Sequence, residues 1–501
     1  NIELNAYGHF AIGRGQGLNG IQAHLHFCPF TQMSHYHRDK LSLILFGAGE
    51  ELLSDTGYVH VRGKNRYFAN SSLSHNTVTV EYDSPDKPLV LVKPGPEFIG
   101  TVERPKWAAM RNRPLQEARS TLIAYDPGVR GEKNVQLIAA SVPGNSRSRL
   151  THRTRELLLI ALDENRSCLL DIFRVQGGVR QNFVLRPSCD EDVLAENCSL
   201  ELGPERAGTL AGENLRYDEI PADRDNIIPY SWLVHRIRTA DAESDWTLTW
   251  RGADSGSRLQ AFIAGVENAE AWLGQSPSLR RARNNGKRAD DFQNPHLLLR
   301  RPEDGGGITF AAVYECVPGN EQGAIRSVAF RWPEGNSSTA PLEVTIQMAD
   351  GEIHVTANCL PIDGAARMVP SYSVAAELGG HAVWRWQWGK SRKRTRLALR
   401  TVYRTAAGDA CNGFLVDGTI GGNAVLPGEW VRLVYGDERA YGYQVEKIVH
   451  QGKSTLVQIA GDPGIKKTGT GIELMYFPFY NTTGSPWIEL PPATFAKHPV
   501  E

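Results

Sequence analysis

The chain has 501 residues, which is too long for a single hydrophobic core, so two or three domains are expected. Its formal net charge is −1 at pH 7, so overall charge favours neither a nucleic acid nor a membrane surface as partner. No run of about 18 apolar residues occurs, so no membrane span is expected. Seven cysteines, none of them in a CxxC pair, argue against a cysteine zinc site and against a disulfide framework.

Strand patterns dominate the chain, and its 49 glycines suit a protein rich in turns. Short runs of apolar and β-branched residues bounded by turn residues predict strands, in chain order, at residues 41–46, 77–82, 156–162, 168–175, 181–185, 245–250, 260–263, 308–314 and 325–330. Residues 163–167 have the composition of a hairpin loop. The best helical period, a weak one, covers residues 106–119.

These elements predict an all-β fold, a large multi-stranded antiparallel β-sandwich followed by a smaller β-rich domain. A polar segment at residues 332–338 is typical of a linker. We therefore expect the sandwich to cover residues 1–335 and a C-terminal β-rich accessory domain to cover residues 336–501.

Histidines and aspartates cluster between residues 35 and 75. If residues 35–39 are extended, His35, His37 and Asp39 share one face of a strand. His37, Asp55 and His75 are separated by 18 and 20 residues, which fits adjacent strands joined by turns. Two imidazoles and a carboxylate suit zinc or another divalent metal. The residues alone leave open a metal site and a set of ordinary surface or core histidines.

Three motifs in this part of the sequence also occur in other kinds of site, so each needs its context to be interpreted. HxHxD also opens the metallo-β-lactamase zinc motif, but Lys40 stands here where that motif has a second histidine, and the β/α alternation of that fold is absent. A second HxH, His24 and His26, lies on an expected strand, so HxH alone indicates little. The GxGxxG at residues 15–20 precedes a strand-like stretch, which favours a glycine-rich strand connection over a dinucleotide site.

The motifs around the cluster resemble those of the heparinase II/III-like polysaccharide lyases, in the β-sandwich half of those enzymes. They are SHYHRDKLSL at residues 34–43, LSDTGY at 53–58, RYF at 66–68 and SHNTV at 74–78. The resemblance covers about residues 1–330 and is specific over the first 80. It implies that His35 lies in the catalytic cleft and that His37, Asp55 and His75 bind a metal, commonly zinc.

The resemblance also indicates roles for the neighbours of these residues. Asp39 is expected to orient a ligand, as carboxylates behind metal ligands do. Tyr58, Arg66, Tyr67 and Asn76 are expected to support the site or to contact substrate.

A resemblance to these enzymes implies β-elimination on an acidic, uronate-containing glycan, such as a glycosaminoglycan or an alginate-like polymer. The uronate carboxylate must be neutralised, the weakly acidic C5 proton removed and the departing O4 oxygen protonated. In the family a tyrosine, an asparagine and a histidine of an N-terminal (α/α) toroid share this work with the sandwich histidine. His35 is the counterpart here, and an imidazole pKa of about 6.5 lets it accept a proton or stabilise charge near neutrality.

No toroid pattern occurs in the 501 residues, and the chain starts at Asn1 without a methionine or a leader segment. We therefore expect that the toroid has been removed or belongs to another chain, unless this domain works differently. The resemblance further implies a bacterial protein that is secreted or periplasmic.

Two other functions stay open. Trp384, Trp386 and Trp388 alternate along an expected strand and precede a basic run at residues 390–396. An exposed face of this kind would stack on sugars in a non-catalytic glycan-binding protein, whereas a buried one would be sandwich core, the interpretation that the alternation favours. A zinc-dependent hydrolase is the other alternative.

Overall fold

The computed structural model describes residues 3–4, 8–27, 37–57, 64–84, 87–91, 120–129, 133–144, 152–178, 180–220, 230–282, 288–301, 306–362, 367–389, 394–475, 481–492 and 494–497. Within these ranges the strands pair in antiparallel sheets, and α1 (Lys64–Ala69) is the one α-helix. The predicted all-β sandwich class is therefore confirmed.

An eight-stranded sheet forms the centre of the molecule. Its strands, in spatial order, are β13 (Val193–Cys198), β15 (Trp246–Gly252), β16 (Arg258–Ile263), β19 (Gly307–Val317), β11 (Ser167–Gln176), β10 (His152–Ala161), β9 (Val135–Pro143) and β8 (Thr121–Asp126). Both faces of β10 are buried, because Leu157 and Leu159 enter one core while Leu158 and Ile160 enter another. A strand buried on both sides is apolar at successive positions, which explains the continuous runs at 156–162 and 168–175.

Two sheets cover one face of the central sheet. One contains β1 (Glu3–Leu4), β2 (His9–Arg14), β3 (Ile21–His26), β4 (Ser42–Gly47) and β5 (Glu50–Leu53). The other contains β14 (His235–Asp241), β17 (Glu270–Pro277), β18 (Gln293–Arg301), β12 (Arg180–Leu185), β6 (Val78–Ser84) and β7 (Lys87–Leu91). Both share one hydrophobic core with the central sheet, in which Phe183 of β12 stacks on Phe310 of β19 with 5.5 Å between ring centroids. This core supports the ends of β4, β5 and β6, where the candidate site lies.

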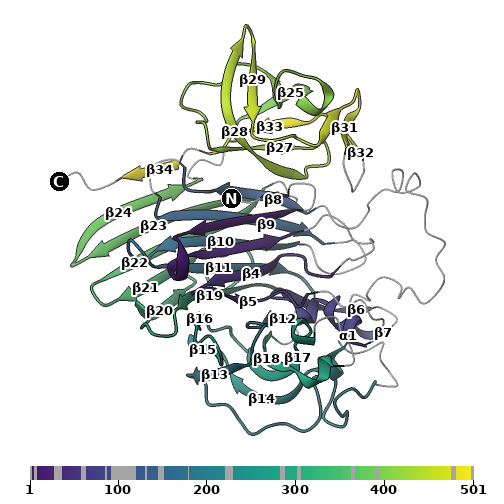
Figure 1. Ribbon diagram of the computed structural model, residues 1–501, viewed down its shortest axis with the longest axis vertical. Helices are drawn as coiled ribbons and strands as arrows, with labels where there is room; N and C mark the ends of the chain where they lie inside the picture. The colour runs from purple at the N-terminus through teal and green to yellow at the C-terminus, as the bar shows by residue number, and fades with distance from the viewer. Residues whose placement is uncertain are drawn as a thin grey trace.

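A third sheet covers the opposite face of the central sheet, as the green strands of Figure 1 show. It contains β20 (Ile325–Arg331), β21 (Leu342–Met348), β22 (Gly351–Ile362), β23 (Arg367–Leu378), β24 (His381–Trp388) and β34 (Thr494–Lys497). Strands β20 and β21 pair with each other on either side of residue 335. The expected boundary thus falls between two neighbours in one sheet, and the division into domains at that position stays a prediction.

The C-terminal part of the chain forms a closed barrel at one end of the long axis (Figure 1). Its strands are β25 (Arg396–Tyr403), β26 (Gly413–Asp417), β29 (Ser454–Ile459), β28 (Ala440–Gln451), β27 (Trp430–Val434) and β33 (Trp487–Glu489). A small sheet of β30 (Ile465–Lys467), β31 (Gly471–Leu474) and β32 (Asn481–Thr483) accompanies it. The barrel contacts the central sheet, where Arg432 donates to the carbonyl of Ile123 at 2.7 Å.

The structure confirms the predicted strands to within a few residues, because each predicted run overlaps an observed strand. Residues 15–20 join β2 to β3 through the 3-10 helix η2 (Gly17–Asn19), so the GxGxxG is a strand connection. Residues 37–40 form a bend and a turn before β4, so the strand expected over residues 35–39 is wrong in its described part. The helical period at 106–119 lies outside the described residues.

The tryptophans of β24 belong to the core between the central and third sheets. Trp386 is fully buried, and Trp384 and Trp388 are less than one-tenth exposed. The prediction of an exposed stacking face, which the glycan-binding alternative requires, is therefore wrong. The alternation on β24 arises because one face of that strand packs into the sandwich.

Candidate metal centre

Three side chains from separate segments converge beside the ends of β4, β5 and β6. His37 precedes β4, Asp55 follows β5, and His75 lies between the 3-10 helix η3 (Ser72–Ser74) and β6. One potential ligand atom from each residue lies within 4.8 Å of the other two. The imidazoles of His37 and His75 are 5.3 Å apart between ring centroids. We call these three residues the triad, and they could hold a metal ion.

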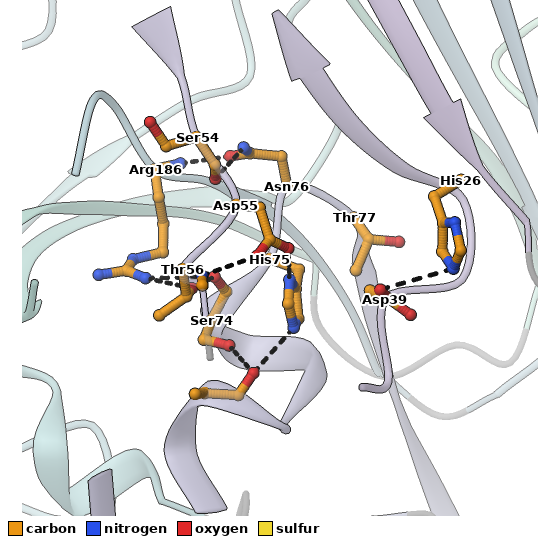
Figure 2. Close-up of polar contacts among 12 residues, drawn as sticks. His26, Asp39, Ser54, Asp55, Thr56, Ser74, His75, Asn76, Thr77 and Arg186 are labelled. Atoms are coloured by element: carbon orange, nitrogen blue, oxygen red, sulfur yellow. Dashed lines mark hydrogen bonds and ion pairs between the residues drawn. The ribbon is translucent and has the colours of Figure 1, made fainter. Parts of the chain in front are cut away.

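The ring of His75 is fully buried, and each of its nitrogens lies beside a polar partner. Nε2 donates to the carbonyl of Ala69 at 2.9 Å, which leaves the lone pair of a neutral ring on Nδ1 (Figure 2). Nδ1 lies 3.0 Å from Oδ2 of Asp55, without the alignment of a directed hydrogen bond, so charge dominates this contact. Burial acts to lower the pKa of His75, but the Asp55 carboxylate outweighs burial and the pKa is raised.

This arrangement passes a simple test for a cation site. A neutral Nδ1 and a carboxylate oxygen each present lone pairs to the space between them, so a proton or a cation must lie there. Ligating histidines in metal sites commonly donate their other ring N–H to a backbone carbonyl, as His75 does to Ala69. Two imidazoles and one carboxylate fit zinc and similar divalent ions.

Asp55 is held as a charged ligand by the turn that follows β5. Its Oδ1 accepts the backbone N–H of Gly57 at 2.7 Å, and Gly57 has a φ of +78°. Burial acts to raise the pKa of Asp55, but His75, His37 and the Gly57 N–H together hold it well below its usual range. The Asp-Thr-Gly turn therefore aims a carboxylate that stays ionised.

His37 is the third member of the triad and stays neutral near pH 7. Burial is the main cause that lowers the pKa of His37, and the charge of His75 lowers it further. The carboxylates of Asp55 and Asp39 act to raise it but do not outweigh these two causes. A neutral imidazole retains the lone pair that a metal requires.

Asn76 lies behind the triad and joins three segments. Its amide nitrogen donates to the carbonyls of Leu43 and Ser54, both at 3.1 Å, and its Oδ1 accepts the backbone N–H of Arg186 at 2.6 Å. Asn76 is fully buried, so its side chain supports the site from within and offers no surface to a substrate.

Arg186, which the sequence analysis did not single out, joins the two segments that carry Asp55 and His75. Its guanidinium donates to Thr56 Oγ1 at 2.9 Å and to the carbonyl of Ser74 at 3.2 Å (Figure 2). Thr56 and Ser74 are the chain neighbours of the two triad residues. An arginine at the end of an apolar strand carries no local signal of this role.

A buried ion pair supports the opposite side of Asn76. Arg155 contacts Asp171 through two hydrogen bonds of 2.8 and 2.6 Å and also donates to the carbonyls of Leu41 and Asn76. Both charged side chains are fully buried. Since the pair lies on β10 and β11, the central sheet holds the backbone beside the triad.

The remaining predicted site residues lie elsewhere or outside the described part. Asp39 is not one of the three mutually close ligand residues, and its Oδ2 lies 3.6 Å from Nε2 of His26, but its charge still acts on the pKa of His37 and His75. Arg66 is half-buried on α1. His35 and Tyr58 lie outside the described residues, as does the side chain of Tyr67.

A second metal-capable group occurs on β22 and β23, the two middle strands of the third sheet. Ligand atoms of Glu352, His354 and Glu377 lie within 4.8 Å of one another, and all three side chains are partly exposed. The triad differs from this group because His75 is fully buried. No helix among the described residues is long and apolar enough to cross a membrane.

Comparisons with solved structures return heparinases at low identity. A heparinase III described as the BT4657 gene product is 12% identical with a TM-score of 0.42, over 71% of this chain and 41% of that one. The heparan sulfate lyase HepC from Pedobacter heparinus is 14% identical with a TM-score of 0.40, over 70% and 42%. This chain thus spans about two fifths of the length of those proteins.

A family model gives the assignment. No curated protein sequence matches the chain. The model of the heparinase II/III-like C-terminal domain matches residues 19–288, which is more than half of the chain and includes the whole triad. The chain therefore belongs to the heparinase II/III-like family, through the C-terminal domain of that family.

Proposed function

We propose that this chain forms the metal-binding sandwich portion of a polysaccharide lyase that cleaves a uronate-containing acidic glycan by β-elimination. The observation that carries the proposal is the convergence of His37, Asp55 and His75 within a domain of the heparinase II/III-like family. We propose zinc as the ion, because two imidazoles and one carboxylate form a donor set that zinc favours.

In this proposal the triad organises the site and His35 faces the substrate. His37 offers a neutral nitrogen, and His75 would coordinate through Nδ1 after giving up the proton that Asp55 favours, while Asp55 offers the compensating charge. When bound, the ion supplies a positive charge that fixes the segments before β4, after β5 and before β6. His35, two residues before His37, accepts the C5 proton or stabilises the charge on the uronate carboxylate.

A complete elimination site needs more groups than His35. A second group must protonate the leaving oxygen, and a donor must neutralise the uronate carboxylate. We propose that an N-terminal toroid supplies a tyrosine and an asparagine for these roles, from the same protein or from another chain. A glycan substrate of this class goes with a secreted or periplasmic location, which cell fractionation would test.

The test measures cleavage and metal content together. The protein, with its toroid-bearing region where a longer chain or a partner carries one, is incubated with heparan sulfate, chondroitin sulfate and alginate. Ultraviolet absorbance of an unsaturated uronate then reports elimination. Cleavage without that absorbance would indicate a hydrolase, and binding without cleavage would indicate a glycan-binding protein.

Three variants separate the proposed roles. His37→Ala should lose both the ion and the activity, whereas His35→Ala should lose activity and retain the ion. His381→Ala, at an exposed position on β24, is the matched control and should change neither. Loss of the ion from His35→Ala would refute this division of roles.

A further inference from the structure

Three histidines outside the triad share one face of the sheet formed by β1 to β5. The register of β2 and β3 places His9 directly opposite His26, and places Ala11 opposite His24. Side chains two residues apart on a strand share a face, so all three imidazoles lie on the same side. That side is the outer one, since Phe10 and Leu25 on the opposite side are buried in the core.

The separation of two of these rings matches shared metal coordination. His9 Nε2 lies 3.1 Å from His24 Nδ1, and the two ring centroids are 5.3 Å apart. Two nitrogens bound to one tetrahedral ion at 2.0–2.1 Å are about 3.3 Å apart. The separation of these two nitrogens is therefore close to the one that a shared ion requires.

His26 lies within reach of the same place. Its ring centroid is 5.7 Å from that of His9, and its Nε2 is 3.6 Å from Oδ2 of Asp39. The latter contact is an ion-pair contact longer than a hydrogen bond. Coordination by His26 would require its side chain to turn from Asp39 toward His9 and His24.

The electrostatics of the cluster leave these nitrogens able to bind a metal at neutral pH. Burial, together with the charges of His26 and His24, lowers the pKa of His9 to about 4. Burial also lowers the pKa of His24. Both rings are therefore neutral near pH 7, and a neutral imidazole is the form that coordinates a metal.

We propose that His9, His24 and His26 form a second metal site, separate from the triad, which takes a late first-row divalent ion such as zinc or copper. A donor set of imidazoles selects these ions over magnesium and calcium, which prefer oxygen ligands. The competing interpretation is a direct hydrogen bond between two neutral rings, which requires no ion.

Metal stoichiometry distinguishes the two interpretations. The full chain is stripped with a chelator, loaded with zinc, passed through a desalting column and analysed for bound zinc per chain. We expect two ions in the unaltered protein, one in the double variant His9→Ala/His24→Ala and one in Asp55→Ala. The combination of all three substitutions should bind none, and the exposed control His450→Ala should bind two.

The outcomes separate this proposal from the one for the triad. If Asp55→Ala retains the full zinc content of the unaltered protein and the double variant binds none, the triad proposal fails and this one stands. If the double variant retains the full zinc content with native circular dichroism, the histidines are only hydrogen-bonded and this proposal is refuted.

A second measurement covers failure of the double variant to fold. Copper(II) added to the His37→Ala/Asp55→Ala protein, in which the triad keeps only one imidazole, should give an electron paramagnetic resonance spectrum with hyperfine splitting from at least two nitrogens. Zinc should protect His9 and His24 from acylation by diethyl pyrocarbonate. A copper spectrum without nitrogen splitting, with unchanged acylation in zinc, would overturn the proposal.

Discussion

Replacing Arg186 with methionine should weaken metal binding at the triad as well as global stability. The guanidinium is fully buried and donates to Thr56 Oγ1 and to the carbonyls of Ser74 and Pro277, the last at 2.8 Å. Its acceptors all lack formal charge, so these contacts form no ion pair with a carboxylate. Methionine fills a similar volume and removes every donor.

The expected magnitude follows from the lost contacts. Three buried acceptors lose a charged donor, and each such loss costs about 1–3 kcal/mol. The substitution also removes the cost of burying a guanidinium, which is visible as a pKa of Arg186 lowered by burial. We therefore expect a net loss of about 3 kcal/mol in the free energy of unfolding. Loss of support behind metal ligands typically lowers affinity by about 10–100-fold.

Two assays on the same preparation test this reasoning. Urea unfolding followed by tryptophan fluorescence gives the change in stability, and zinc titration against a competing chelator gives the affinity. Arg251→Met, at a partly exposed position paired with Glu196 at 3.5 Å, is the control and should alter neither quantity by much. Reduced stability with unchanged zinc affinity would refute the idea that Arg186 positions the ligand segments.

Three further predictions test the fold around the site. Burial and Arg174 lower the pKa of His152 from 6.5 to about 4 in the folded protein. Between pH 6.5 and pH 4 the unfolded chain therefore binds a proton that the folded protein does not, and the free energy of unfolding falls by up to about 3 kcal/mol as the pH drops. His152→Gln should flatten that part of a curve of unfolding free energy against pH. Trp386→Ala should cost about 3–5 kcal/mol in urea unfolding and leave glycan retention in affinity electrophoresis unchanged; lost retention at unchanged stability would contradict the core assignment. Gly57→Ala should lower zinc affinity in the chelator titration, because φ is +78° and the new Cβ would lie 2.8 Å from Cγ of Arg280.

Local sequence patterns predicted the strands because the order of apolar and polar residues along a strand follows which of its faces are buried. The alternation in β21 indicates one buried face, and the continuous apolar run in β10 indicates two. The patterns could not show which strands become neighbours. β25 pairs with β33 about 90 residues later, and this long-range pairing closes the barrel.

The candidate site was predictable where a backbone conformation favours one residue type. The Asp-Thr-Gly turn after β5 needs a glycine at positive φ, and the structure has that conformation at Gly57. The strand expected over residues 35–39 was wrong, because residues 37–40 bend and place Asp39 beside His26, while the supporting role of Asp39 stays a prediction. A strand period says nothing about side chains on a loop.

Supporting charges were the hardest part to predict. Arg155, Arg174 and Arg186 are all fully buried, and two of them contact the carboxylates of Asp171 and Glu156. From the sequence alone, these arginines are typical of strand residues whose guanidinium groups are exposed to solvent. Only the tertiary structure shows that their hydrogen bonds end on the backbone beside the triad and between the sheets.

The charge balance around the triad favours an anionic ligand. Asp55 and Asp39 are both held ionised, with pKa values below their usual range. A divalent ion would balance these two negative charges, and the buried Arg186 would add one positive charge, while the neighbouring Arg280 is paired with Glu51 and Asp190. Such an excess in a partly buried site attracts a carboxylate more than a neutral sugar hydroxyl. If the proposed ion binds, the affinity for a uronate oligosaccharide should therefore fall on metal removal and with rising salt, whereas a neutral oligosaccharide of equal length should respond to neither.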